Sequence, residues 1–293
     1  MNRYKVYVDA AADIPDEQRK RYQINVLPIP VSIDGKTYQS GTELSNAEFY
    51  ALMENSASLP VTSQVTPYAF EELFAKELAE DTERLMLFLI NSKGSATYGN
   101  AISTREAFLS EHADAGMRID VLDGGSYSGG YGYAAILAAQ KLEMGLPYDD
   151  VLSLAEEQLQ KQRIYFGMYT LKYAGKSGRI PSAAVFVGEA LGIKPIMRVW
   201  DHEITTAGKA RGEKKLIHEI VKMTISDMEI NTPYSLLYGS DADAMNELKD
   251  EMTKKVGYPP VYAFQIGAAV AINAGPRMVA TVFEVRKKKR DAK

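Results

Sequence analysis

The residue types best suited to binding an anion occur in a polar turn at residues 92–97, between the apolar run 84–90 and a helical pattern. In an open α/β sheet the carboxyl ends of the strands face the ligand crevice, and a helix N-terminus offers unpaired N–H groups. Ser95 and Thr97 add hydroxyl donors. Because the turn lacks the Gly-Lys-Ser/Thr ending of a phosphate-binding loop, it favours a carboxylate over a triphosphate. The alternative is that Ser95 only caps the helix.

A second polar turn, Thr-Ser-Gln at residues 62–64, lies just before Thr66 and Pro67, a pair typical of a helix start. The turn is either a solvated loop or a shelf of donors that faces the same crevice as Ser95. Two hydroxyl turns that converge on one point would hold a carboxylate without a fixed cation. Charge-assisted hydrogen bonds contribute about 1.5–3 kcal/mol each, which anchors a head group whose tail supplies most of the affinity.

Two aspartates support a different hypothesis, a metal-dependent enzyme. Asp9 ends the first strand-like segment and Asp123 follows another. Carboxylates at strand ends can share a divalent cation, as in phosphotransfer sites. The glycines at residues 124–132 do not match the dinucleotide fingerprint, because their spacing differs and they do not follow the first strand. They are interpreted as a turn.

Two further polar residues leave their roles open. Arg179 lies in a basic connection at residues 172–181, where it could pair with a carboxylate or phosphate or form a salt bridge between domains. Asn273 lies at residues 272–277, which we interpret as a turn between apolar strands. Its amide could donate to a ligand or be satisfied by the turn backbone.

The composition excludes several function classes. The 293 residues carry a formal net charge of −4, so no global charge favours nucleic acid. Cys is absent and there are three His, which excludes disulfides and thiol nucleophiles and argues against a metal cluster or another cofactor. No Gly-x-Ser-x-Gly or His-Glu-x-x-His motif is present. Without a signal-like or membrane-spanning apolar run, the expected location is the cytoplasm, with no stable membrane insertion.

The elements that must position these residues alternate between strand and helix patterns in the first half of the chain. This order predicts an α/β fold: a three-layer α/β/α domain with a mostly parallel sheet, at residues 1–165. A smaller α+β domain is expected at residues 166–293, with a small-residue helix at 182–191 and a hairpin at 193–206. The basic run 286–290 is interpreted as a solvated tail.

These segments, in this order, resemble the DegV family of bacterial fatty-acid-binding proteins over nearly the whole chain. Each motif is short, but seven or more in the right order and spacing are specific. The motifs are Val8-Asp9, Thr62-Ser63-Gln64, Ser92-Lys93-Gly94-Ser95-Ala96-Thr97-Tyr98, Asp123, Leu171-Lys172-Tyr173, Gly178-Arg179-Ile180, Ile193-Lys194-Pro195-Ile196, Lys209-Ala210-Arg211 and Gly275-Pro276.

The resemblance implies a carrier that binds one long-chain fatty acid and does no chemistry itself. Its carboxylate would rest on Thr62 and Ser95, with Ser63, Thr97 and Asn273 as further contacts. Arg179 and Arg211 would lie near the head group or on a partner-facing edge, and a fatty-acid kinase is the partner that the resemblance suggests. An interaction module with a vestigial cleft remains a further alternative. Apolar residues that could line a tunnel, or simply form core, are Phe166, Phe186, Leu191, Ile193, Ile196, Phe264 and Ile266.

The chain departs from the family pattern at several positions. The usual His-x-Gly-Pro-Gly turn has Asn273 in place of the imidazole and Arg277 in place of the last glycine. Ala96 replaces a glycine, and Ala10 replaces a serine. The missing imidazole bears more on presentation to a kinase than on lipid binding, because Thr62 and Ser95 are both intact.

Overall fold

The computed structural model describes residues 3–174, 178–180 and 192–286. The chain forms two compact units, Met1–Gln160 with Gln265–Ile272, and Lys161–Phe264 with Asn273–Lys293. The predicted boundary between residues 165 and 166 lies inside a strand of the second unit. The prediction also did not include the segment Gln265–Ile272, near the end of the chain, in the first unit. The predicted helix 182–191, with Phe186 and Leu191, lies outside the described residues, as does most of the basic tail.

The first unit is built on a four-stranded sheet in which every neighbouring pair is parallel. One of the two central strands comes from the apolar run at residues 84–89, which suits a strand covered on both faces. The register aligns Val8 with Phe88, and Leu89 with Asp123. In spatial order the strands are β2 (Ile24–Leu27), β1 (Tyr4–Asp9), β6 (Arg84–Leu89) and β7 (Arg118–Asp123).

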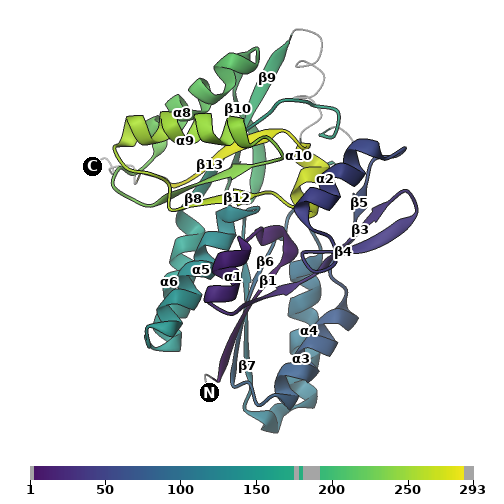
Figure 1. The fold of residues 1–293 in the computed structure, drawn as a ribbon. Helices are drawn as coiled ribbons and strands as arrows, with labels where there is room; N and C mark the ends of the chain where they lie inside the picture. Colours follow the sequence, from purple (N-terminus) through teal and green to yellow (C-terminus); the bar gives the residue numbers. More distant parts are fainter. Residues whose placement is uncertain (1–2, 175–177, 181–191, 287–293) are drawn as a thin grey trace. The chain divides into compact units, whose positions relative to one another are not determined.

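Helices cover both faces of this sheet (Figure 1). The helix α5 (Gly129–Glu143) packs on β1 and β6, and its many glycines and alanines let it approach the strands closely. On the other face, α4 (Thr97–Glu111) contacts β7 and packs against α3 (Pro67–Ala79). Two more helices, α1 (Asp16–Arg21) and α6 (Tyr148–Lys161), lie on the α5 side (Figure 1). The predicted three-layer arrangement is therefore confirmed.

A small antiparallel sheet completes the first unit. It has the order β4 (Lys36–Ser40), β3 (Ile29–Ile33), β5 (Val61–Thr62). The apolar stretch 24–33 is divided at Pro28 into β2 and β3, and β2 is an edge strand of the parallel sheet. The helix α2 (Asn46–Asn55) starts at a capping box, in which Ser45 accepts from the Glu48 N–H.

The second unit contains a six-stranded sheet and two long helices, α8 (Leu216–Asp227) and α9 (Ala242–Val256). The predicted hairpin is formed by β9 and β10, and consecutive strands from β10 to β11 in the sheet order pair antiparallel. The smaller α+β part of the fold is thus confirmed. In spatial order the strands are β10 (Glu203–Arg211), β9 (Ile193–Trp200), β8 (Gln162–Met168), β13 (Met278–Glu284), β11 (Tyr234–Tyr238) and β12 (Tyr262–Gln265).

The candidate tunnel residues are mostly interior. Phe166 is 5% exposed, and Ile196, Phe264 and Ile266 are fully buried, whereas Ile193 is half-buried. Across the part of the chain that the structure describes, no helix is both long enough and apolar enough to cross a membrane.

Candidate functional site

Polar turns gather at the carboxyl edge of the parallel sheet in the first unit. The strand β1 ends at Asp9, the turn after β6 carries Ser95, and the turn after β7 starts at Asp123. Because the strands are parallel and adjacent, their carboxyl ends share one edge, which is where open α/β sheets bind ligands. The order of the strands thus collects polar groups that are far apart in the sequence.

The turn at residues 91–97 is shaped by its own hydrogen bonds. The Asn91 carbonyl accepts from the N–H groups of Gly94 (2.9 Å) and Ser95 (3.1 Å). The Ser95 Oγ accepts from the Thr97 N–H at 3.3 Å and lies 3.0 Å from Thr97 Oγ1. Ser95 is not the N-cap of α4, which is Ala96 without a side-chain cap; it lies one residue earlier, and of the helix N–H groups it accepts only from the first. The Thr97 hydroxyl can donate to Ser95 Oγ, which leaves the Ser95 proton for another acceptor.

The second hydroxyl turn is bound directly to the first. The Val65 N–H donates to Thr97 Oγ1 at 3.1 Å, and the Asn100 side chain donates to the Val65 carbonyl at 2.8 Å. Thr97 is fully buried, Thr62 is half-buried and Ser63 is exposed. The structure therefore brings the turns that carry Thr62 and Ser95 together, through a threonine whose hydroxyl is occupied by protein partners.

A tyrosine from the third turn supports the Ser95 turn. Asn91 Nδ2 donates to the Tyr127 hydroxyl at 3.2 Å. A Cβ atom added to Gly94 would lie 2.3 Å from that hydroxyl, so only glycine lets the turn close on Tyr127. Asn91, Asn100 and Tyr127 were not among the site residues predicted from the sequence. Their position in the sequence could have identified them, because each lies within three residues of a hydroxyl or glycine turn at a strand or helix end.

Asp9 and Asp123 do not form the metal pair of the enzyme hypothesis. They lie at the ends of β1 and β7, with β6 between them, so their backbones are about 9–10 Å apart at the usual strand spacing. Asp123 Oδ1 accepts from the N–H groups of Ser92 (3.1 Å) and Gly125 (2.9 Å). Across the described residues, no group of three His, Cys, Asp or Glu could hold a metal ion.

The side chain of Asp9 instead forms hydrogen bonds that stabilise the fold. The buried carboxylate accepts from the Ile90 N–H (2.7 Å), the Ala11 N–H (3.1 Å) and the Tyr131 hydroxyl (2.5 Å). Burial raises the pKa of Asp9 to about 6, and the three hydrogen bonds act in the opposite direction. The carboxyl therefore ties β1, β6 and α5 together at the polar edge.

A second buried carboxyl, Asp13, was not anticipated. Asp13 Oδ1 accepts from the Gly267 N–H at 2.8 Å, whereas the buried Oδ2 has no hydrogen-bond partner. Ser128 lies beside this carboxyl. Burial raises the pKa of Asp13 to about 8, against the effect of these hydrogen-bonding neighbours and with a smaller contribution from Asp9. Asp13 is thus poised to be neutral near pH 7.

The remaining predicted site residues belong to the second unit. Arg179 is exposed, and Arg211 is the exposed last residue of β10. Asn273 lies in the last turn of α10 (Ala268–Ala274), so the expected turn between two strands is wrong in this detail: a helix precedes it. Five consecutive residues without glycine or proline, Ala-Ala-Val-Ala-Ile, favour the helix.

Arg277 is bound by neighbouring side chains of the second unit. Its Nε and Nη2 donate to Asp241 Oδ2 at 3.1 and 3.0 Å, and its guanidinium lies 4.6 Å from the Tyr169 ring centroid. Glu213 lies 3.5 Å away. Asp241 also caps α9 by accepting from the Ala244 N–H at 3.0 Å. The Arg277 side chain is therefore part of a local ion-pair network within the second unit.

The fold and these turns define the class of the protein, an α/β protein with hydroxyl turns at the carboxyl edge of a parallel sheet. The model of a family described as "Uncharacterised protein, DegV family" matches residues 3–286. The chain therefore belongs to the DegV family.

Known relatives extend over most of the chain. A DegV domain-containing protein of Caldanaerobacter subterraneus is 27% identical over 287 residues, 97% of this chain and 99% of the relative. One from Listeria innocua is 30% identical over 241 residues, 81% of this chain and 83% of the relative.

Solved structures of the same family share the fold. A Thermus thermophilus DegV-family protein described as fatty-acid binding has a TM-score of 0.82 and 28% identity, covering 96% of this chain and 99% of that one. A stearic-acid-binding protein from Eubacterium ventriosum has a TM-score of 0.85 over 97% of this chain and 98% of that one. Its 23% identity supports likeness of fold alone.

Proposed function

We propose that the protein binds a long-chain fatty acid and carries it, without chemistry of its own, in the cytoplasm. The observation that carries the proposal is the hydrogen-bonded contact between the two hydroxyl turns, Val65 N–H to Thr97 Oγ1 at 3.1 Å. It joins Thr62 and Ser95 to one polar edge. The fatty-acid binding described for the Thermus thermophilus relative gives the class of ligand.

In this proposal the head group rests on hydroxyl donors. Thr62, Ser63 and Ser95 donate to the carboxylate, and the partial positive charge of the α4 N-terminus adds to the attraction. Thr97 is buried and engaged by Val65, so its role is to hold the two turns together. No fixed cation is required, because the acyl chain supplies most of the affinity at about 0.8 kcal/mol per buried CH₂.

We also propose that the exposed Arg179 and Arg211 face a partner enzyme that acts on the carboxylate, with a fatty-acid kinase as the candidate. Both side chains are exposed in the second unit. Guanidinium groups recognise carboxylates and phosphates well because their geometry is bidentate. The charge of these residues makes electrostatic steering of the partner the expected contribution.

The test is lipid binding by full-length variants. Native mass spectrometry of the purified protein should detect one bound fatty acid. Thr62→Ala and Ser95→Ala should each weaken fatty-acid binding by about tenfold, the loss expected for one charge-assisted hydrogen bond. Ser103→Ala is the matched control, because Ser103 is an exposed serine on α4 that donates only to the Asn100 carbonyl. Wild-type affinity in Thr62→Ala and Ser95→Ala, or no lipid in any preparation, would contradict the proposal.

A further inference from the structure

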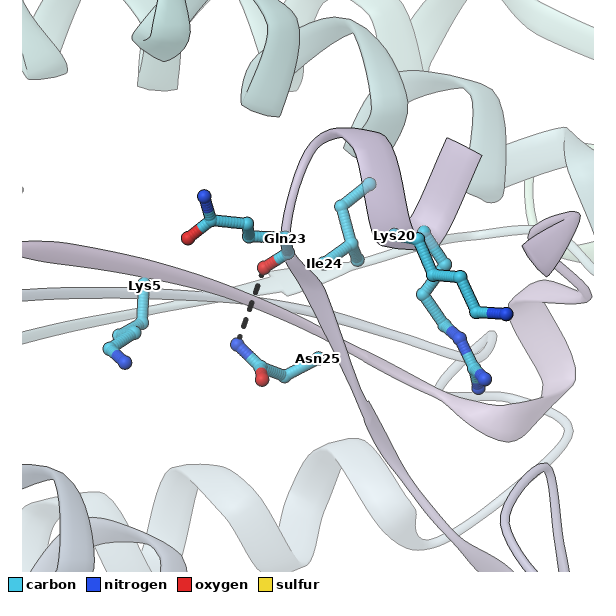
Figure 2. Close-up of a pocket in the computed structure, with 6 residues that line it drawn as sticks. Lys5, Lys20, Gln23, Ile24 and Asn25 are labelled. Atoms are coloured by element: carbon cyan, nitrogen blue, oxygen red, sulfur yellow. Dashed lines mark hydrogen bonds between the residues drawn. The ribbon is translucent and has the colours of Figure 1, made fainter. Parts of the chain in front are cut away.

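A basic hollow lies at the opposite, amino-terminal edge of the same parallel sheet. Its volume is ≈ 260 Å³. Figure 2 shows its lining side chains, which come from the start of β1, from α1 and from the start of β2. Three of the six lining residues are cationic, two are amides and none is acidic: Lys5, Arg19, Lys20, Gln23, Ile24 and Asn25.

The strand register explains how this set is assembled. Tyr7 pairs with Asn25, and Lys5 lies two residues before Tyr7 on β1, so Lys5 and Asn25 share one face of the sheet. The strand β2 is an edge strand, which leaves this end open beside α1. The last turn of α1 contributes Arg19 and Lys20. Basic residues at a helix C-terminus are common, but that preference does not explain Lys5, which comes from a strand.

The three cationic side chains of the hollow make only exposed ion pairs or backbone hydrogen bonds with other groups that the structure describes. Lys5 lies 3.5 Å from Glu80, and both side chains are more than a third exposed. Arg19 pairs with the exposed Asp16 at 3.0 Å and donates to the Gly41 carbonyl at 3.1 Å. Lys20 makes no ion pair with any residue that the structure describes. Exposed ion pairs of this kind contribute little, so a multiply charged anion can compete for these groups.

We propose that this hollow binds a phosphate group. A phosphate brings up to two negative charges and three acceptor oxygens, which suit a hollow lined by two ammonium groups and one guanidinium. The Asn25 amide already donates to the Val6 and Gln23 carbonyls, both at 3.4 Å. The volume is close to the lower end for small-molecule sites and suits a head group rather than an acyl chain. Ile24 is the one apolar lining residue. The site is independent of the hydroxyl turns, which lie at the carboxyl edge of the sheet.

Titration calorimetry of the full chain with inorganic phosphate and with sn-glycerol 3-phosphate, at constant ionic strength, tests the proposal. Lys20→Gln and Lys5→Gln should each raise the Kd by about three- to tenfold, as expected for a charge contact that is partly screened. The matched control is Lys249→Gln, which removes the same charge from an exposed position on α9. Fatty-acid binding and circular dichroism of all three variants should equal those of the wild type.

Vesicles distinguish the two sources of the phosphate. Sedimentation with phosphatidylcholine vesicles, with and without phosphatidylglycerol, reports binding to a lipid head group. Binding of glycerol 3-phosphate alone supports a free phosphate ester, and binding to the phosphatidylglycerol vesicles that Lys20→Gln removes supports a head group. Absence of binding to phosphate, glycerol 3-phosphate and vesicles overturns the proposal. Equal Kd values for Lys20→Gln, Lys5→Gln and Lys249→Gln overturn it as well.

Discussion

At the scale of single residues, Thr97 shows how a hydroxyl at a candidate site can act on structure. Its Oγ1 accepts the Val65 N–H and lies beside Ser95 Oγ, so one buried side chain links two turns that are 32 residues apart. A buried N–H without an acceptor costs about 1–3 kcal/mol. Thr97 thereby stabilises the position of the turn that carries Thr62.

Replacing Thr97 by Val should therefore reduce the free energy of unfolding by about 1–3 kcal/mol, because the buried Val65 N–H loses its acceptor while the side-chain volume is nearly unchanged. Urea denaturation measures this change. Thr104→Val on the same helix is the control, because the buried Thr104 hydroxyl has no hydrogen-bond partner and its removal should cost nothing. Equal stability of the two variants would show that the Val65 contact does not contribute.

At the scale of elements, α8 lies close to β8 in the second unit because Gly167 has no side chain. A Cβ atom at this position would lie 2.6 Å from Cδ1 of Leu216 and 3.0 Å from Cδ1 of Ile220. Both of these α8 residues are fully buried. The glycine therefore sets the distance between helix and sheet, and interiors packed this tightly tolerate added volume poorly.

Gly167→Ala should lower the free energy of unfolding by about 1–3 kcal/mol through overpacking. The double variant Gly167→Ala/Leu216→Ala should lose less stability than the two single variants lose together, because the smaller side chain at position 216 makes room for the new methyl group. The expected coupling free energy is about 0.5–3 kcal/mol. A double-mutant cycle by urea denaturation measures this coupling. The comparison cycle uses Leu248→Ala, a fully buried residue on α9, for which additive losses are expected.

At the scale of the whole molecule, two buried carboxyls make stability depend on pH. The pKa of Asp9 is raised to about 6 and that of Asp13 to about 8, in both cases mainly by burial. A carboxyl with a raised folded-state pKa binds its proton more tightly in the folded protein. Its stabilisation is complete below the unfolded-state pKa near 4 and is lost as the pH rises through the folded-state pKa.

Asp13→Asn, which mimics the neutral carboxyl, should match the wild type near pH 4 and become progressively more stable than it up to about pH 8. The difference should grow by at most about 1.4 kcal/mol per pH unit and then stay constant. Urea denaturation at several pH values measures it. Asp114→Asn, at an exposed position, should follow the wild-type profile. A pH-independent difference between Asp13→Asn and the wild type would contradict the assigned pKa shift.

Local patterns in the sequence predicted most of the elements, because strand and helix periodicity, caps and prolines act over a few residues. The hairpin of β9 and β10 and the start of α3 at Pro67 follow this rule. The helix α10 was missed because a short apolar run suits a strand and a helix equally. The return of Gln265–Ile272 to the first unit is a long-range arrangement that no local pattern encodes.

The sequence by itself determined the α/β class, the family motifs and the two hydroxyl turns as candidates for holding a carboxylate. Only the tertiary structure decided how these turns are joined, because the Val65–Thr97 contact requires the segment after β5 to meet the start of α4, 32 residues further along the chain. It also decided that β6 separates Asp9 from Asp123, and that Asp13 is buried against Gly267. Strand order and burial result from packing between segments that are distant in the sequence, whereas motifs and helix caps depend on a few consecutive residues and can be recognised in the sequence alone.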